Sequence, residues 1–406
     1  MAGGLKLRVG YQHRTPATIG EPQDTHHQPP TTKSMATLPQ RTWAEINTAH
    51  ARHNLAQSRR AAGKRAIMAI LKANAYGHGA VEMARVFSRE GIDAIGVGDS
   101  GEALELREAG IKVPILIVGA VIEGEMPAVV EREIEVNLHT VEMAEALQKE
   151  AARQDKRVRV HLKIDTGMGR LGMQPFQAVP FLHRMHNLKN LELVGLCTHF
   201  SYPYEENPNF TLRQLERFNV AVDVARRLGY DNLTLHAASS LALFRRRESL
   251  FNMVRPGVAL WGLLPGDEKG LAKKLKPVMA WKTRIVFLKD VPEGQPIGYN
   301  RTYYTPNPTR IATLPVGYND GYRRALSNKS DVLINGKRCP VVGLVSMDYT
   351  TVDVSAVPNA KVGDVVTLIG KDGKQEISAE GLAAQAGVSV YELMCGLGRR
   401  VVRVYA

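Results

Sequence analysis

The chain has 406 residues, of which 44% are hydrophobic and 23% charged, a composition typical of a soluble protein with two domains and a tail. The longest nearly pure apolar run, Ile115–Ile122, is too short to span a bilayer, and three cysteines favour a reduced cytoplasmic protein over a disulfide framework. The net charge of +13 includes clusters such as Arg245–Arg247, but no nucleic-acid-binding motif accompanies them, which favours a solvated basic surface over a nucleic-acid partner.

Residues 1–37 differ in composition from the rest of the chain. They are rich in threonine, proline and glycine and have no sustained hydrophobic periodicity, so we predict a disordered extension. They lack the apolar core of a secretory signal. The sequence leaves open whether translation starts at Met1 or at Met35.

Residues 38–276 alternate between short apolar runs and helical patterns. Eight such strands with helices between most of them predict an α/β fold, a parallel (β/α)8 TIM barrel. The helical patterns cover Ala80–Glu90, Glu102–Ala109, Val141–Ala152 and Thr211–Leu228. The expected strands are Ala66–Leu71, Ala94–Val97, Ile115–Val118, Glu135–Leu138, Val158–Ile164, Leu193–Cys197, Leu233–His236 and Val258–Leu260, and the last is the least distinct.

Residues 277–406 change to short β-rich runs separated by turn residues such as Asn335-Gly336 and Asp372-Gly373. This pattern predicts a separate, mostly antiparallel β domain with one helix near Ala379–Ala386. The expected strands are Lys282–Leu288, Arg310–Leu314, Asp331–Ile334, Val341–Val345, Thr351–Val354, Val365–Ile369 and Val401–Tyr405.

Lys72 stands at the end of the first barrel strand, beside a turn of small residues that includes Gly77 and Gly79. Desolvation beside such a turn would destabilise the ammonium form and leave an amine nucleophile suited to Schiff-base chemistry. A lysine at a strand end is also commonly just solvated, so this position alone leaves both interpretations open.

The ends of the other strands test the interpretation, because active residues of a barrel gather at the C-terminal ends of its strands. Ser239 follows strand seven and Gly257 belongs to the last barrel unit, and barrels commonly bind phosphate on the loops after strands seven and eight. Capping of the next helix is the alternative role for Ser239. Together with Lys72, these residues indicate an aldehyde cofactor that carries a phosphate, namely pyridoxal phosphate.

Seven segments, in the same order along residues 40–406, resemble those of alanine racemases, which are pyridoxal-phosphate enzymes of fold type III. The most specific are Ala69–Ala80 (AILKANAYGHGA) and Lys163–Gly172 (KIDTGMGRLG). The others are Gly195–Phe200, Asn252–Gly262, Gly298–Tyr303, Pro315–Tyr322 and Val345–Val352. The resemblance implies an isomerase that interconverts L- and D-alanine and supplies D-alanine for peptidoglycan in the cell wall.

The resemblance implies two catalytic bases on opposite faces of the substrate. Lys72 would carry pyridoxal phosphate and act on the D face, and Tyr299 would act on the L face. Tyr299 would enter the barrel of a partner subunit, so each active site would require a homodimer. Arg255 would donate to the pyridine nitrogen and, because arginine stays protonated, would favour reprotonation at Cα over transamination.

The resemblance also implies the remaining site residues, with no metal ion among the ligands. Arg170 would pair with the substrate carboxylate, and the backbone N–H of Met347 would donate to the same group. Lys163 matches a position that is often carbamylated, although an ion pair with Asp165 stays an alternative. The other expected contacts are Tyr76, Ser239, Gly257, Val258 and Tyr391 with the phosphate, His199 with the cofactor ring, and Tyr318 and Arg324 along the substrate path.

Two departures from the family pattern concern that path: Leu344 replaces a frequent arginine and Ser346 a frequent cysteine. They leave open a broader racemase that acts on serine or lysine. A decarboxylase of basic amino acids fits less well, because no catalytic cysteine motif is evident. A non-catalytic pyridoxal-phosphate carrier would resemble the barrel alone, whereas this chain also carries the second domain with Tyr299.

Overall fold

The computed structural model describes residues 40–264 and 270–406. The predicted disordered extension, residues 1–37, lies outside the described residues. Within the described part of the chain, none of the helices is both long and apolar enough to cross a membrane.

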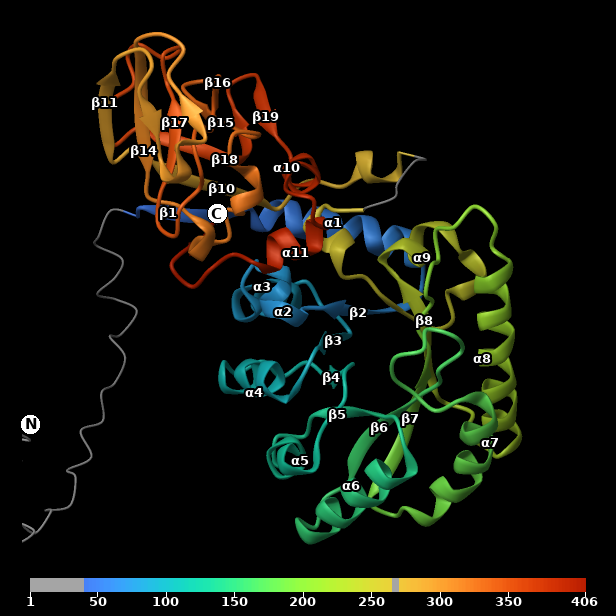
Figure 1. The fold of residues 1–406 in the computed structure, drawn as a ribbon. Coiled ribbons are helices and arrows are strands. Elements are labelled where there is room, and N and C mark those ends of the chain that lie inside the picture. Colours follow the sequence, from blue (N-terminus) through green and yellow to red (C-terminus); the bar gives the residue numbers. More distant parts are fainter. Residues whose placement is uncertain (1–39, 265–269) are drawn as a thin grey trace, which may run out of the picture. The chain divides into compact units, whose positions relative to one another are not determined.

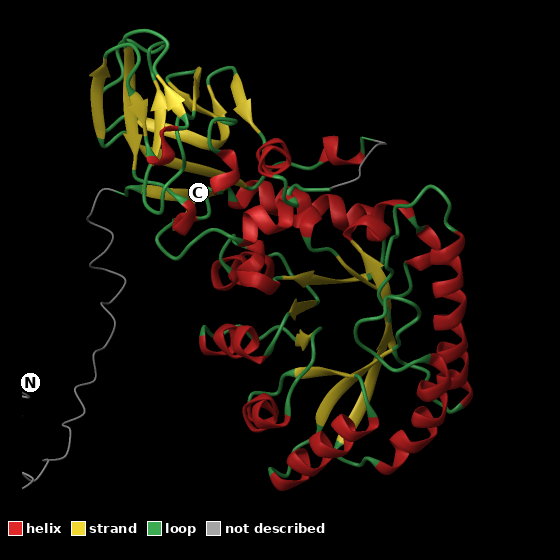
Figure 2. Cartoon of the chain, in the orientation of Figure 1, coloured by secondary structure: helices red, strands yellow, loops and turns green. Residues whose placement is uncertain are grey.

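Eight parallel strands close into a barrel, which confirms the predicted fold class (Figures 1 and 2). The barrel closes where Ala66 pairs with Met253 and Ile67 pairs with Val254, so the first and last strands are neighbours. The strands are β2 (Ala66–Ile70), β3 (Ala94–Val97), β4 (Ile115–Ile117), β5 (Glu135–Leu138), β6 (Val158–Lys163), β7 (Leu191–Cys197), β8 (Thr234–Ser239) and β9 (Met253–Arg255).

Helices follow most of these strands and lie outside the barrel (Figure 1). Asp99 and Thr140 accept hydrogen bonds from backbone N–H groups of α4 (Ser100–Glu108) and α6 (Val141–Arg153), and so cap both helices. Further helices of the barrel are α2 (Lys72–Tyr76), α3 (Ala80–Arg89), α5 (Met126–Glu131), α7 (Pro175–Arg184), α8 (Asn209–Arg227) and α9 (Ser240–Arg245). The four helices predicted from periodicity are all present.

The predicted eighth strand, Val258–Leu260, is wrong. The strand is Met253–Arg255, and residues Val258–Trp261 form a 3₁₀ turn instead. Pro256 has no N–H to donate to the ladder, so the regular pairing with β2 ends before it, and only its carbonyl still accepts from the Ile70 N–H at 3.0 Å. The apolar run after Gly257 is buried in the core, and a short apolar run cannot by itself distinguish a strand from a buried turn.

The second sheet is mostly antiparallel, as predicted, and has the strand order β16-β15-β18-β10-β1-β20, with β19 paired to β18. Its strands are β1 (Thr42–Ile46), β10 (Met279–Arg284), β15 (Asp331–Ile334), β16 (Lys337–Pro340), β18 (Val365–Asp372), β19 (Gln375–Ile377) and β20 (Val402–Tyr405). Two smaller sheets combine β11 (Phe287–Val291), β14 (Thr309–Leu314) and β17 (Thr350–Asp353), and β12 (Pro296–Ile297) with β13 (Tyr303–Tyr304). Three further helices are α1 (Thr48–Ala62), α10 (Ala379–Ala386) and α11 (Val390–Cys395).

Three details of this region differ from the sequence prediction. β1 pairs with β10 and β20, so a segment that we assigned to 38–276 adds a strand to the sheet of 277–406. The predicted strand Lys282–Leu288 is divided between β10 and β11. No strand forms at Val341–Val345. β15 instead forms a hairpin with β16, because Asn335 (φ 50°) and Gly336 (φ 76°) make a two-residue turn directly after β15. The division at residues 276 and 277 otherwise stays a prediction.

We predict that Trp281→Ala will lower the free energy of unfolding by about 3–5 kcal/mol, the usual cost of removing a buried tryptophan. The Trp281 side chain is fully buried and its Nε1 donates to Thr42 Oγ1 at 3.1 Å, so it also links β10 to β1. Guanidinium denaturation at fixed protein concentration measures the change. Phe287→Ala is the control, because Phe287 is 55% exposed. Equal effects of the two substitutions would contradict the assigned packing.

Candidate active site

A cavity of about 450 Å³ opens at the C-terminal ends of the barrel strands. All the residues that the sequence predicted to contact a cofactor line this cavity: Lys72, Tyr76, His199, Ser239, Arg255, Gly257, Val258 and Tyr391. Lys163 and Arg170 line it too. The barrel and α11 together therefore bring side chains from positions 72 to 391 into one concave surface.

Lys72 enters the cavity because the chain turns in an unusual way after β2. Within α2 (Lys72–Tyr76), Ala73, Asn74 and Ala75 have φ of 53°, 51° and 53°, and ψ near 50°, which is a left-handed helical turn. For residues other than glycine this conformation costs roughly 1–2 kcal/mol each. Tertiary contacts must therefore hold it in place.

Hydrogen bonds on both sides of Asn74 supply part of that restraint. The Asn74 N–H donates to Glu102 Oε1 at 3.1 Å, and Asn74 Oδ1 accepts from the Ala80 N–H at 2.7 Å. Gly77 (φ 83°) ends the turn, and a Cβ at this position would lie 2.1 Å from the carbonyl oxygen of Met394. Glycine is thus required both by the backbone angle and by the close approach of α11.

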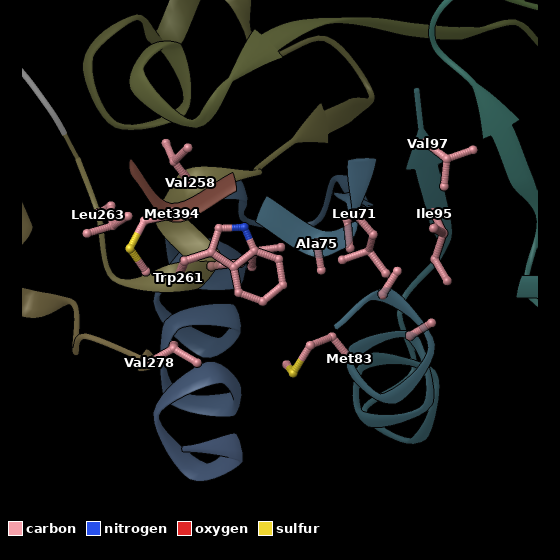
Figure 3. Close-up of a cluster of buried hydrophobic side chains, with 14 of the residues drawn as sticks. Leu71, Ala75, Met83, Ile95, Val97, Val258, Trp261, Leu263, Val278 and Met394 are labelled. Atoms are coloured by element: carbon pink, nitrogen blue, oxygen red, sulfur yellow. The ribbon is translucent and has the colours of Figure 1, made fainter. Parts of the chain in front are cut away.

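An apolar cluster packs against the turn that carries Lys72. Leu71 and Ala75 belong to the main hydrophobic core together with Val258 and Trp261. Figure 3 shows that side chains from separate parts of the chain, including Met394 of α11, gather around Trp261. The short segments that carry Lys72 and Gly257 are therefore fixed by one shared core.

The electrostatic environment favours a neutral amine on Lys72. Burial lowers the pKa of Lys72, and the positive charge of Arg170 lowers it further. Burial likewise lowers the pKa of Lys163 to about 8. Clustered cations in a partly desolvated cavity thus give two lysines an increased fraction of the uncharged, nucleophilic form.

Tyr76, Ser239 and Gly257 form a small cradle on one side of the cavity. A Cβ on Gly257 would lie 2.8 Å from Tyr76 Oη, so glycine leaves room at this point. Ser239 occupies the N-cap position of α9, but its side chain forms no capping hydrogen bond, which makes the capping alternative wrong. The neighbouring Ser240 Oγ instead accepts from the Gly257 N–H at 2.8 Å. The Ser239 hydroxyl is therefore available to the cavity.

Arg255 is 7% exposed and is held by the ends of neighbouring strands. Its Nη2 donates to the carbonyl oxygens of Thr198 at 2.8 Å and Ala237 at 3.0 Å, and its Nη1 lies 2.9 Å from His236 Nδ1. Among the described residues, Arg255 Nε forms no hydrogen bond. That N–H can therefore donate to a ligand in the cavity.

Asp165 organises the loop that leads to Arg170. Its carboxylate accepts hydrogen bonds from the N–H groups of Gly167, Met168 and Gly169 at 2.9–3.1 Å. No ion pair joins Asp165 and Lys163 in the described part of the chain, so the alternative of a direct Lys163–Asp165 pair is not formed. Asp165 acts on the loop backbone instead.

The remaining predicted site residues do not line the cavity of Lys72. Tyr299, Tyr318, Arg324 and Met347 line a second cavity of about 600 Å³, together with Leu344 and Ser346. Tyr299 is 70% exposed and Met347 54% exposed. Monomeric proteins rarely expose large side chains of this kind next to one another on the surface.

Arg400 fixes the backbone beside this second cavity. It forms a two-pronged ion pair with the buried Asp320 at 3.0 Å and a further bond from Nη1 to Asp348 Oδ1 at 2.7 Å. Asp320 in turn accepts from the Gly317 N–H at 3.0 Å. The turn that carries Tyr318 and the loop that carries Met347 are therefore clamped together.

Sequence reasoning missed several polar residues in and below the barrel. Asn137, Cys197, Tyr204 and Cys395 also line the first cavity. Glu135 and His161 are buried inside the barrel although they stand in predicted strands. Glu135 and His161 could have been identified as ionisable residues within otherwise apolar strands. No comparable signal connects Cys395 with Lys72, because Cys395 reaches the same cavity only through the packing of α11.

The comparisons with known proteins agree along the chain. Residues 46–265 match the family model "Alanine racemase, N-terminal domain", and residues 278–405 match "Alanine racemase, C-terminal domain". The chain is 40% identical over 365 residues to an alanine racemase of Halothermothrix orenii, covering 90% of this chain and 96% of the relative. Over 366 residues it is 40% identical to one of Methanococcus maripaludis, with 89% and 98% covered.

Solved structures give the same result. The alanine racemase of Clostridium difficile 630 superimposes with a TM-score of 0.86 at 33% sequence identity, covering 91% of this chain and 96% of that one. The alanine racemase of Streptomyces lavendulae gives a TM-score of 0.85 at 32% identity, with 91% and 98% covered.

Proposed function

This chain belongs to the alanine racemase family, and from the geometry of its two cavities we propose how its residues interconvert L-alanine and D-alanine. The enzyme is an isomerase that acts on a small amino acid, and the general role of the activity is to supply D-alanine for peptidoglycan. The observation that carries the proposal is the convergence of Lys72, the Tyr76–Gly257 cradle and Arg255 on one cavity.

We infer that the cavity at the barrel mouth binds pyridoxal phosphate, the cofactor on which this family generally depends. The donor set fits this group. Lys72 offers an amine for the aldehyde, and Tyr76, Ser239 and Tyr391 offer hydroxyls near the space that Gly257 leaves for a phosphate. Arg255 offers its Nε–H for a ring nitrogen. When bound, the cofactor withdraws electrons from the substrate and thereby acidifies its α-hydrogen.

The residues of this chain would then hold the substrate and move one proton. Arg170 and the backbone N–H of Met347 bind the carboxylate and fix the amino acid in one orientation. The amine of Lys72 removes or returns the α-proton on the D face, and the phenolic oxygen of Tyr299 does so on the L face. One base removes the proton while the other supplies one, which inverts the configuration. Arg255 donates a hydrogen bond but keeps its proton, because a guanidinium stays charged.

We further propose that the enzyme is a homodimer with shared active sites. Within one chain, Lys72 and Tyr299 line separate cavities. The exposed Tyr299, Tyr318 and Met347 form a surface suited to close the barrel mouth of a second copy. Arg324, Leu344 and Ser346 would then border the path of the substrate. The three cysteines are free thiols, which supports a cytoplasmic location.

Lys163 is proposed to become carbamylated. With its pKa lowered to about 8, roughly a tenth of its amine is uncharged at pH 7 and can attack carbon dioxide, with loss of one proton. The resulting negative charge would attract Arg170, which also lines the cavity, and so orient its guanidinium toward the substrate carboxylate.

Lys72→Ala is expected to abolish the visible absorbance of the bound cofactor, because the amine that attaches the aldehyde is lost. Absorbance spectra of purified protein, after removal of free cofactor, make the measurement. Lys64→Ala is the matched control, since Lys64 is an exposed lysine outside the cavity. Retention of the band in Lys72→Ala would refute the cofactor assignment.

Tyr299→Phe should slow removal of the α-proton from L-alanine by at least about a hundredfold, the lower range for loss of a general base. Proton removal from D-alanine should be affected much less. Incorporation of deuterium from ²H₂O, followed separately for each enantiomer, distinguishes the two. Tyr304→Phe controls for loss of an exposed tyrosine hydroxyl nearby in sequence. Equal losses for both enantiomers would argue against two bases.

Mixed dimers of Lys72→Ala and Tyr299→Phe subunits should recover activity although each parent is inactive. One of their two sites would contain an intact Lys72 and an intact Tyr299, so purified mixed dimers should reach about half of the normal activity. Two different affinity tags allow the mixed dimers to be isolated. Inactive mixed dimers would contradict the shared site.

A further inference from the structure

A column of buried polar side chains runs through the barrel interior and ends at Arg255. It begins with Glu135, the first residue of β5, and continues through His161 on β6 and His236 on β8. These three side chains belong to residues that are 7%, 2% and 1% exposed. Ionisable groups are rarely buried to this extent unless each has a partner.

Each member of the column is within hydrogen-bond distance of the next. Glu135 Oε2 lies 3.1 Å from His161 Nε2, and His161 Nδ1 lies 2.9 Å from His236 Nε2. His236 Nδ1 lies 2.9 Å from Arg255 Nη1. Four side chains from four strands therefore form one continuous chain of hydrogen bonds.

The chemistry of the two ends fixes the direction of every bond in between. Arg255 can only donate, so Nδ1 of His236 must accept and its hydrogen must be on Nε2. That hydrogen is donated to Nδ1 of His161, which places the hydrogen of His161 on Nε2. The last acceptor is then Oε2 of Glu135. Both imidazoles are neutral and both carry their hydrogen on Nε2.

Several contacts favour this arrangement. Burial lowers the pKa of His236 well below its usual value, and the charge of Arg255 lowers it further, so the ring is neutral. Arg159 Nη1 pairs with Glu135 Oε1 at 2.8 Å, so both side-chain oxygens of Glu135 have a partner. A Cβ on Gly195 would lie 2.2 Å from His161 Nδ1, so glycine on β7 leaves space for the ring to reach His236.

We propose that Glu135, at the end of the barrel opposite the active site, is a positioning residue for Arg255. Its carboxylate accepts from His161 and thereby sets the ring hydrogens of both histidines, so that His236 presents a bare Nδ1 to the guanidinium. This inference rests on the proposed function in one respect, namely that Arg255 is a ligand of the cofactor.

Removal of the Glu135 carboxylate would reverse the direction of the hydrogen bonds along the column. Without an acceptor at position 135, the Nε2–H of His161 would be buried without a partner, which is costly. The ring can avoid that cost by moving its hydrogen to Nδ1, which forces the hydrogen of His236 onto its own Nδ1. Two donors, His236 Nδ1–H and Arg255 Nη1–H, would then face each other and displace the guanidinium.

The test compares Glu135→Leu, which removes the acceptor, with Glu135→Gln, whose amide oxygen still accepts. Glu133→Leu is the control, because Glu133 and Glu135 both line a small cavity at the opposite end of the barrel, whereas the ion pair that Glu133 forms among the described residues is with Lys156 at 3.8 Å. The ring nitrogens of ¹⁵N-histidine-labelled holoenzyme report which nitrogen carries hydrogen. Single His→Gln substitutions assign the signals of His161 and His236, and racemisation rates and thermal unfolding are measured on the same samples.

We expect hydrogen on Nε2 of both histidines in the unaltered enzyme, in Glu135→Gln and in Glu133→Leu. Glu135→Leu should move the hydrogen of His236 to Nδ1 and lower kcat by about tenfold or more, whereas Glu135→Gln should stay within about threefold. Hydrogen on Nδ1 of His236 in the unaltered enzyme would overturn the proposal, even if Glu135→Leu fails to fold. Equal losses in the two Glu135 variants without a change of ring hydrogens would overturn it as well.

The visible cofactor absorbance of the unaltered enzyme separates this proposal from the proposed function. An intact band together with the wrong ring hydrogens refutes the role of Glu135 alone. Absence of the band refutes the cofactor assignment, while the ring hydrogens still report on the column itself.

Discussion

A permanently charged guanidinium buried at the mouth of the barrel is the constraint on which much of this structure depends. Transfer of such an ion from water costs several kcal/mol unless acceptors replace its hydration. Backbone carbonyls of Thr198 and Ala237 and the ring of His236 supply those acceptors to Arg255. The ends of β7 and β8 are therefore held together by one side chain from β9.

The same charge contributes to the chemistry of its neighbours. Burial is the main reason that the pKa of Lys163 is low, and the nearby Arg255 and Arg170 lower it further. Lys72 shows the same pattern, with Arg170 as the main charged contributor. A barrel mouth that gathers cations thus increases the uncharged fraction of both lysine amines above that of a solvated lysine.

The sequence allowed the barrel and the strand-end residues to be predicted because both depend on local patterns. Periodicity locates most strands and helices, and the rule that active residues follow strand ends leads to Lys72 and Ser239, whereas the role of Arg255 came from the family resemblance. The errors arise where a distant contact decides the structure. β1 joins a sheet whose other strands are more than 230 residues away in sequence, and Pro256 ends β9 before the apolar run that we had taken for a strand. The column from Glu135 to Arg255 was missed because strand periodicity does not show which polar side chains face one another inside a barrel.

The position of β1 between β10 and β20 has a consequence for synthesis of the protein. Thr48 N–H donates to the carbonyl of Ala406 at 2.8 Å, and the Ala406 N–H donates to the carbonyl of Ile46 at 3.0 Å. A nascent chain that emerges from the ribosome carries β1 early but cannot pair it on both sides until residues 402–406 have been translated. The barrel strands can associate during that interval, whereas the second sheet is completed only after translation has reached the last residues. Until β20 is available, the edge of β1 that β20 covers is open to association with other chains.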